Sequence, residues 1–248
     1  MQYALVNNIK SEPVKGANGV CPGCRKEVIA KCGKIKIHHW AHKTLTDCDN
    51  WWEPETEWHR EWKNKFPAEY REIPFFDEKN NEYHRADIHT PNGVTIEFQN
   101  SPISIEELQS RDAFYSKLIW VVNAAKFKKG FTFTRQIPWP DDPRLKDFEI
   151  AGLIYFKKED ILNSKEGDLL LVYGSNSPEL KDVPLSEVHF AFEWKNPHKA
   201  WFNSSAPMFF DFGGAYLYRL KKREQIRDSF WYVKMLRKLD FITKYSNY

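Results

Sequence analysis

The chain has 248 residues, of which 42% are hydrophobic and 16% aromatic, values typical of a globular rather than a disordered protein. Its net charge of +3 is too small by itself to indicate a nucleic-acid partner. No apolar run approaches the ~20 residues that span a membrane, and the N-terminus lacks the pattern of a signal peptide. We therefore expect a cytoplasmic protein with no membrane partner.

Metal-binding residue types gather near the N-terminus. The four cysteines are Cys21, Cys24, Cys32 and Cys48. Clustered cysteines in a cytoplasmic protein favour metal over disulfides, and Cys21-x-x-Cys24 before a histidine cluster is typical of a structural zinc knuckle. By spacing alone His38 and His42 complete the set, with Cys32 and Cys48 as further candidates. Residues 1–50 are thus interpreted as a zinc-knuckle-like segment, and a metal-free turn with buried cysteines is the alternative.

Residues 51–72 are predicted to be helical, because Pro54 suits a first helical turn and the apolar residues recur at helical spacing. The apolar stripe consists of Trp58, Trp62 and Phe66. Glu55 and His59 fall within or beside it and, four positions apart, can contact each other. A buried acid needs a partner. The pair is therefore either a hydrogen bond at the rim of an aromatic core or part of a site.

Two alternating runs, Arg85–His89 and Thr95–Gln99, flank an Asn-Gly pair, which is a strong hairpin signal. Asp87 and Glu97 are then offered to one place from neighbouring strands. Magnesium-type cations are held by one or two carboxylates that leave water and phosphate positions open. The hairpin is thus a candidate metal site for phosphodiester chemistry, with an ordinary solvated hairpin as the alternative. Arg85 shares the Asp87 face and either clamps a phosphate or neutralises Asp87.

A second helix follows this hairpin. Ser104-x-x-Glu107 forms a capping box, and the helix is expected to reach about Lys117. The continuous apolar run 118–122 suits a buried parallel strand. Residues 51–123 are thus predicted to run helix, three strands, helix, strand, in an α/β fold.

The C-terminal part begins after a basic, Phe-rich bridge and a Pro-rich stretch. Residues 136–248 are interpreted as an α+β accessory region. Its predicted strands cover 150–156, 169–173 and 187–192, and an amphipathic helix is predicted over 226–237. From Arg219 to Lys238 there are eight Lys or Arg against two acids. Such a basic helix either holds nucleic acid or is a solvated face.

Together these motifs resemble the nuclease domain of the competence protein CoiA family, a branch of the PD-(D/E)xK nuclease superfamily. The motifs are Glu55-Thr-Glu-Trp-His59-x-x-x-Lys63, Arg85-Ala-Asp87-Ile, Ile-Glu97-Phe-Gln99-Asn-Ser101 and Arg111-x-x-x-Tyr115. Cys21-Pro-x-Cys24 and His39-Trp-Ala-His42 resemble the amino-terminal segment of the same family. The resemblance covers roughly residues 18–123.

The resemblance implies a DNA-cleaving enzyme with its core at residues 51–135. Asp87 and Glu97 would bind magnesium or manganese, and Glu55, with His59 beside it, would contact that metal. Gln99 stands where the superfamily has a lysine, so Lys63 or Arg111 is expected to supply positive charge. Gln99 is expected to act in catalysis, and Tyr115 is expected to contact the phosphates.

For the N-terminal segment the resemblance implies zinc held by Cys21, Cys24, His39 and His42.

Three alternatives to these interpretations stay open. Arg111 and Tyr115 could instead be a surface arginine that packs over a core tyrosine. Two other functions stay open: a non-catalytic nucleic-acid-binding protein with a nuclease-like fold, and a zinc-containing protein-interaction module.

Overall fold

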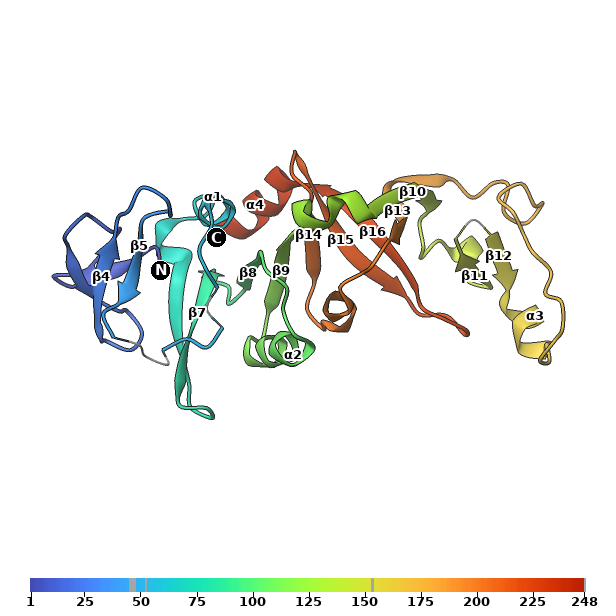
Figure 1. The fold of residues 1–248 in the computed structure, drawn as a ribbon. Coiled ribbons are helices and arrows are strands. Elements are labelled where there is room, and N and C mark those ends of the chain that lie inside the picture. The colour runs from blue at the N-terminus through green and yellow to red at the C-terminus, as the bar shows by residue number, and fades with distance from the viewer. Residues whose placement is uncertain (45–47, 52, 153, 248) are drawn as a thin grey trace. The chain divides into compact units, whose positions relative to one another are not determined.

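The computed structural model describes residues 1–44, 48–51, 53–152 and 154–247 (Figure 1). The chain divides into two compact units. The first contains Met1–Asn123, His198–Met208 and Leu239–Tyr248, and the second contains Ala124–Pro197 and Phe209–Lys238. Two segments that the sequence pattern grouped with the C-terminal region therefore fold with the first unit. Within the described residues, none of the helices combines the length and apolar character that a membrane crossing requires.

The first unit begins with a small antiparallel sheet of order β2-β1-β3-β4-β5. Its strands are β1 (Ala4–Val6), β2 (Ile9–Ser11), β3 (Asn18–Val20), β4 (Glu27–Lys31) and β5 (His39–His42). Ala4, Val28 and Trp40 form its buried core, and Cys21 and Cys48 pack against them. The segment interpreted as a zinc knuckle is thus a small sheet with two of its cysteines, Cys21 and Cys48, buried against the core.

The larger part of the first unit has the expected order of helix, three strands, helix, strand. Its elements are α1 (Glu57–Lys63), β6 (Arg71–Asp77), β7 (Glu82–His89), β8 (Thr95–Gln99), α2 (Ile105–Phe114) and β9 (Leu118–Asn123). A 3-10 turn (Ala68–Tyr70) precedes β6, and α4 (Lys238–Ser246) closes the unit. The strands are ordered β9-β8-β7-β6, with β8 parallel to β9 and the other pairs antiparallel. The α/β class and the predicted crossover are confirmed.

The two helices lie on opposite faces of β8. Trp62 of α1, and Phe66 just after the helix, pack their rings on Phe98, and Arg111 of α2 reaches Glu97. Because adjacent residues of a strand point to opposite faces, the two helices enclose the strand from both sides. Figure 1 shows α1 and α2 on either side of this strand. Of the predicted aromatic stripe, Trp58 and Trp62 lie on α1 and contact Phe98, whereas Phe66 contacts the same ring from beyond the end of the helix.

Helix α1 starts later than predicted. Thr56 is its N-cap, and the Thr56 side chain and His59 form a reciprocal capping box across the first turn. The prediction that residues 51–72 are helical was therefore wrong at both ends, since Glu55 precedes the cap and Arg71 already belongs to β6. Helix α2 begins at the predicted Ser104 cap but ends at Phe114, before Lys117.

The second unit is mainly antiparallel sheet, ordered β10-β13-β16-β15-β14. The strands of this sheet are β10 (Phe131–Pro138), β13 (Leu185–Trp194), β14 (Met208–Asp211), β15 (Tyr216–Arg223) and β16 (Phe230–Arg237). A separate two-stranded sheet consists of β11 (Phe148–Ala151) and β12 (Ile154–Lys157). Helix α3 (Lys158–Asn163) and 3-10 turns at Ala124–Gly130 and Pro143–Leu145 complete this unit, and the 3-10 turn Lys199–Asn203 belongs to the first unit.

Three predictions for this region need correction. Residues 226–237, predicted as an amphipathic helix, contain strand β16, because the aromatic and β-branched run from Phe230 onward pairs along β15. The predicted strand 150–156 is the two strands β11 and β12, with Leu153 outside the described residues. Of the predicted strand 169–173, only Tyr173 forms a bridge, to Tyr155. The predicted strand 187–192 is confirmed within β13.

Candidate active site

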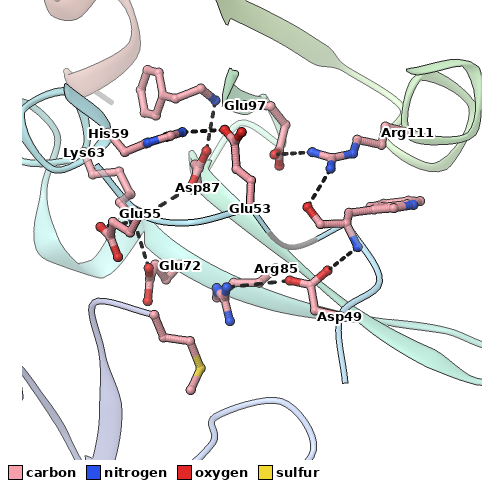
Figure 2. Close-up of a pocket in the computed structure, with 13 residues that line it drawn as sticks. Asp49, Glu53, Glu55, His59, Lys63, Glu72, Arg85, Asp87, Glu97 and Arg111 are labelled. Carbon is pink, nitrogen blue, oxygen red and sulfur yellow. Dashed lines mark hydrogen bonds and ion pairs between the residues drawn. The ribbon is translucent and has the colours of Figure 1, made fainter. Parts of the chain in front are cut away.

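A cavity of about 50 Å³ opens between α1, β7, β8 and α2 (Figure 2). It is lined by Met1, Asp49, Trp51, Glu53, Glu55, His59, Lys63, Glu72, Arg85, Asp87, Glu97, Phe98 and Arg111. A buried water needs only about 10–15 Å³ of such space, so the cavity has room for a small ion or a few waters. Seven of the nine residues predicted for the nuclease site line it, and Gln99 and Tyr115 do not.

Asp87 and Glu97 come together because the hairpin opens at this point. The β7–β8 ladder pairs His89 with Thr95 and Ile88 with Ile96 and then stops. Asp87 and Glu97 occupy the next positions of that register. A carboxylate oxygen of Asp87 accepts a hydrogen bond from the Phe98 N–H at 2.9 Å, in place of the missing ladder bond. The two strands therefore separate while their acids stay beside one cavity.

The charges of these two acids are poorly compensated. Glu97 is 5% exposed, and its Oε1 has no hydrogen-bond partner among the described residues. Burial raises the pKa of Glu97 well above its usual range, the charge of Asp87 raises it further, and Arg111, at 3.4 Å, only partly offsets them. Burial also raises the pKa of Asp87, despite the nearby Lys63. Both shifts mean that an added cation would stabilise the ionised pair.

Lys63 supplies positive charge from α1. Its ammonium lies 2.7 Å from Glu55, 2.8 Å from Glu72 and 3.8 Å from Asp87. Burial alone would lower the pKa of Lys63, but these three carboxylates raise it, so the side chain stays charged. The expected Glu55–His59 pair is absent among these contacts: Glu55 binds Lys63 and Arg60 instead, because it lies outside the helix. That expectation was wrong.

His59 instead pairs with Glu53, a residue that the sequence pattern did not single out. The Nδ1 atom of His59 accepts from the Thr56 N–H at 3.2 Å, and Nε2 lies 2.6 Å from Glu53. Nε2 is therefore the donor to the carboxylate. The sequence signal that could have pointed to this pair is the Thr56-x-x-His59 spacing, because an N-cap at Thr56 places both Glu53 and Glu55 outside the helix.

Glu53 joins the segment before α1 to the turn after β8. Its carboxylate accepts the N–H groups of Asn100 and Ser101, both at 3.0 Å, and the Ser101 hydroxyl. Burial by itself would raise the pKa of Glu53, but His59 and these donors outweigh it and lower the pKa. Figure 2 shows the Glu53 carboxylate turned toward the cavity between Asp87 and Glu97. Unlike those two acids, it is well compensated by neighbouring donors.

Of the remaining predicted residues, Arg85, Arg111 and Gln99 are held by protein partners. Arg85 lies 3.7 Å from Asp49, and Arg111 donates to the Trp51 carbonyl at 2.6 Å and to Glu107. Gln99 donates to the Ser101 carbonyl at 3.1 Å. The hydroxyl of Tyr115 is buried without a hydrogen-bond partner among the described residues, and burial, followed by the charge of Glu97, raises the pKa of Tyr115.

This donor set fits a hard divalent cation. Asp87 and Glu97 offer oxygen ligands, the Glu97 oxygen without a partner is buried beside the cavity, and the acids repel each other in the absence of added charge. Carboxylate oxygens are what Mg²⁺ and Mn²⁺ prefer. The cavity can therefore hold a metal between β7 and β8.

A second candidate metal-binding group lies beside the N-terminal sheet. It consists of Cys21, Cys24, His42 and Cys48, whose ligand atoms all lie within 4.8 Å of one another. Cys21 Sγ is 3.8 Å from Cys48 Sγ, and Cys24 Sγ is 3.2 Å from His42 Nε2. The contact between the two thiols lowers the pKa of Cys21 and raises that of Cys48, so one of the pair is favoured as the thiolate that a metal needs. These residues could hold a structural metal.

His39 does not join this group, contrary to the set that the family resemblance implied. Its Nδ1 lies 2.9 Å from the Ile37 carbonyl. Because side chains alternate along β5, His39 points to the face opposite that of Trp40 and His42. His38 is exposed, and the Cys32 thiol faces the Pro13 carbonyl. Cys48, one of the further candidates from spacing, takes the fourth position.

Comparison with known families agrees with this arrangement. Residues 8–50 match the family model of the competence protein CoiA N-terminal domain, and residues 58–160 match that of the competence protein CoiA nuclease-like domain. No curated protein and no solved structure matches. The first match contains the whole Cys3His group, and the second contains Asp87, Glu97 and Lys63. Because the two matches follow each other in order and together cover more than half of the sequence, the chain belongs to the CoiA-like family of competence proteins.

Proposed function

We propose that this protein is a magnesium- or manganese-dependent deoxyribonuclease of the PD-(D/E)xK type. The observation that carries the proposal is the undercompensated pair Asp87 and Glu97 on the open end of the β7–β8 hairpin, beside one cavity. The order of α1, β6–β8, α2 and β9 is the one expected for that superfamily. The match to a nuclease-like domain supports the same conclusion.

Asp87 and Glu97 would hold the metal. When bound, such a metal polarises the scissile phosphate and lowers the pKa of water to near neutrality. The protein's own residues do the rest. Lys63, at 3.8 Å from Asp87, supplies the positive charge that Gln99 cannot provide, and the well-compensated Glu53 orients His59 at the rim of the cavity. Glu55 and Glu72 act as positioning residues, because they hold the ammonium of Lys63.

Arg85 and Arg111 are the proposed phosphate-binding residues. Both line the cavity and carry fixed charge, which favours a phosphodiester over a neutral ligand. Arg111 additionally faces Glu97, so it couples substrate charge to the metal-binding acid. Tyr115 is a supporting core residue in this scheme, since its ring packs on Phe75 and Phe114 rather than lining the cavity.

The test is cleavage of single- and double-stranded DNA with Mg²⁺ or Mn²⁺, compared between the unmodified protein and Asp87→Asn. The variant should lose hydrolysis by a factor on the order of 10² or more, because an amide is a poorer metal ligand than a carboxylate. Asp77→Asn is the matched control, since Asp77 is the last residue of β6 and lies outside the cavity, so its replacement should leave the rate unchanged. Cleavage that persists in Asp87→Asn, or that is absent under every condition, would refute the proposal.

We also propose that the Cys3His group binds structural zinc. Cys48→Ala should therefore lose one zinc per chain and lower the melting temperature, while His39→Ala should keep both. Metal content is measured by mass spectrometry of the purified proteins, and unfolding by circular dichroism. Equal zinc loss in the two variants, or full zinc content in Cys48→Ala, would be incompatible with the proposed ligand set.

A further inference from the structure

The β15–β16 hairpin of the second unit carries basic side chains on one face. The basic stretch from Arg219 to Lys238 is largely strand rather than the predicted helix, so alternate residues share a face. Arg219 pairs with Lys234 across the two strands, and Lys221 pairs with Tyr232. Lys234 also pairs with His189 of β13, which extends the same face over a third strand.

Three cations on this face form no ion pair within the described residues. Arg219, Lys221 and Lys234 are all partly exposed, and none lies within 4.0 Å of a carboxylate oxygen among the described residues. The Nε of Arg219 is buried, and no described residue offers it a hydrogen-bond partner. By contrast, Lys222, on the opposite face of β15, is paired with Glu224 at 2.5 Å.

Aromatic rings lie beside these cations. Lys234 sits 5.2 Å from the ring centre of Trp139, and the Arg219 guanidinium is 5.8 Å from that of Phe209. Trp139 is 48% exposed, so much of its ring is open to a ligand. His189 lies edge-on to Trp139, and burial, followed by the charges of Lys234 and Lys221, lowers the pKa of His189 to about 4, although Asp141 opposes this.

We propose that this face, formed by Arg219, Lys221, Lys234 and Trp139, binds single-stranded DNA. Residues two apart on a strand are about 6.7 Å apart and neighbouring strands about 4.8 Å, so the three charges form a compact cluster that matches the closely spaced phosphates of a nucleic-acid backbone. An exposed aromatic ring beside such a cluster stacks on unpaired bases, which a duplex keeps inside its own stack. The proposal rests on DNA being the substrate of the proposed nuclease, but it concerns binding by the second unit.

Binding is measured by fluorescence anisotropy with a labelled single-stranded oligonucleotide and with its duplex. All proteins carry Glu97→Gln and the buffer lacks Mg²⁺ and Mn²⁺, so cleavage does not interfere. The variant Arg219→Gln/Lys221→Gln/Lys234→Gln should bind the single strand more weakly. The slope of log affinity against log salt should fall by about 2, at ~0.7 per lost phosphate contact. Lys221→Gln alone should lower that slope by about 0.7, and it covers the case that the triple variant misfolds.

The matched control is Lys146→Gln/Lys157→Gln/Lys222→Gln, which removes the same charge from ion-paired lysines of the second unit. It should leave affinity and slope nearly unchanged. Trp139→Ala should weaken single-strand binding about five- to a hundred-fold and leave duplex binding unaltered. The inference is overturned if the control has the same effect as the face variant, if the face variants keep their salt slope, or if the duplex binds as well as the single strand. Cleavage by the unmodified protein is assayed separately, so a failed nuclease proposal is distinguishable from a failed binding face.

Discussion

Replacing Glu97 by glutamine is expected to have opposite effects on activity and stability. DNA hydrolysis should fall by a factor on the order of 10³, because a proposed metal ligand is lost. The metal-free protein should nevertheless become more stable by about 1–2 kcal/mol near pH 8, because a buried carboxylate beside Asp87 is replaced by a neutral amide of the same shape. Glutamine retains an oxygen that can accept from Arg111.

The sign of the stability change follows from the pKa of Glu97. Since this pKa is raised on folding, the native state binds the proton more tightly than the unfolded chain, and the wild-type protein loses stability as pH rises above the unfolded value of about 4.3. The advantage of Glu97→Gln should therefore vanish at low pH and grow toward alkaline pH. Urea unfolding across pH without divalent cations measures it.

The control for this prediction is Glu107→Gln. Glu107 contacts the same Arg111, but its side chain is 35% exposed and does not line the cavity. Its replacement should leave hydrolysis nearly unchanged and alter the free energy of unfolding by no more than about 0.5 kcal/mol. A Glu97→Gln protein that is less stable than wild type near pH 8, or that still cleaves DNA, would contradict the assignment of Glu97 as an undercompensated metal ligand.

The second large effect is expected at Glu72, where the N-terminal sheet meets the core. Its carboxylate accepts the N–H of Gln2 at 2.8 Å and of Tyr3 at 3.0 Å, and it pairs with Lys63 at 2.8 Å while only 3% exposed. Glu72→Gln should lower the free energy of unfolding at pH 7 by about 3 kcal/mol, the low end for breaking a buried pair, because Glu55 still neutralises Lys63.

Acid should remove the difference between this variant and wild type. Burial alone would raise the pKa of Glu72, but Lys63 and Arg85 hold it well below its usual range. With the folded pKa depressed, the stabilisation is complete above the unfolded value of about 4.3 and is lost as pH falls through the folded pKa. The curves of wild type and Glu72→Gln should therefore converge below pH ~4. Glu69→Gln, a nearby exposed site, is the control, and a deficit that persists unchanged into acid would count against the ion pair as its cause.

Local patterns predicted the hairpin and its acids well. The Asn-Gly turn and the two-residue alternation in β7 and β8 depend on near neighbours only, as does the Ser104 cap of α2. The same reasoning was wrong at the start of the first helix, where it paired His59 with Glu55 although the partner of His59 is Glu53. The cap at Thr56 decides between them, and capping by a histidine is a weaker signal than the usual Glu or Gln.

The C-terminal strands show a different limit. Ile226, Phe230, Val233 and Leu236 recur at helical spacing, yet Phe230–Arg237 is a strand. Its β-branched and aromatic residues gain more from pairing with β15 and β13 than from a helix, and that gain depends on partners distant in sequence. The change from helix to strand also moves Arg219, Lys221 and Lys234 onto one face, which helical spacing would not do.

The order of elements in the nuclease-like core, the acids of its hairpin and the cysteine pair Cys21-x-x-Cys24 all follow from the amino-acid sequence, because they arise from short-range periodicity and turn chemistry. Three features required the folded protein: Cys48 in place of His39, Glu53 in place of Glu55, and Lys63 beside Asp87 while Gln99 binds Ser101. Each joins residues from separate elements, and packing selects the partner by burial and charge compensation. Such selection acts on distances in space, which spacing along a chain does not encode.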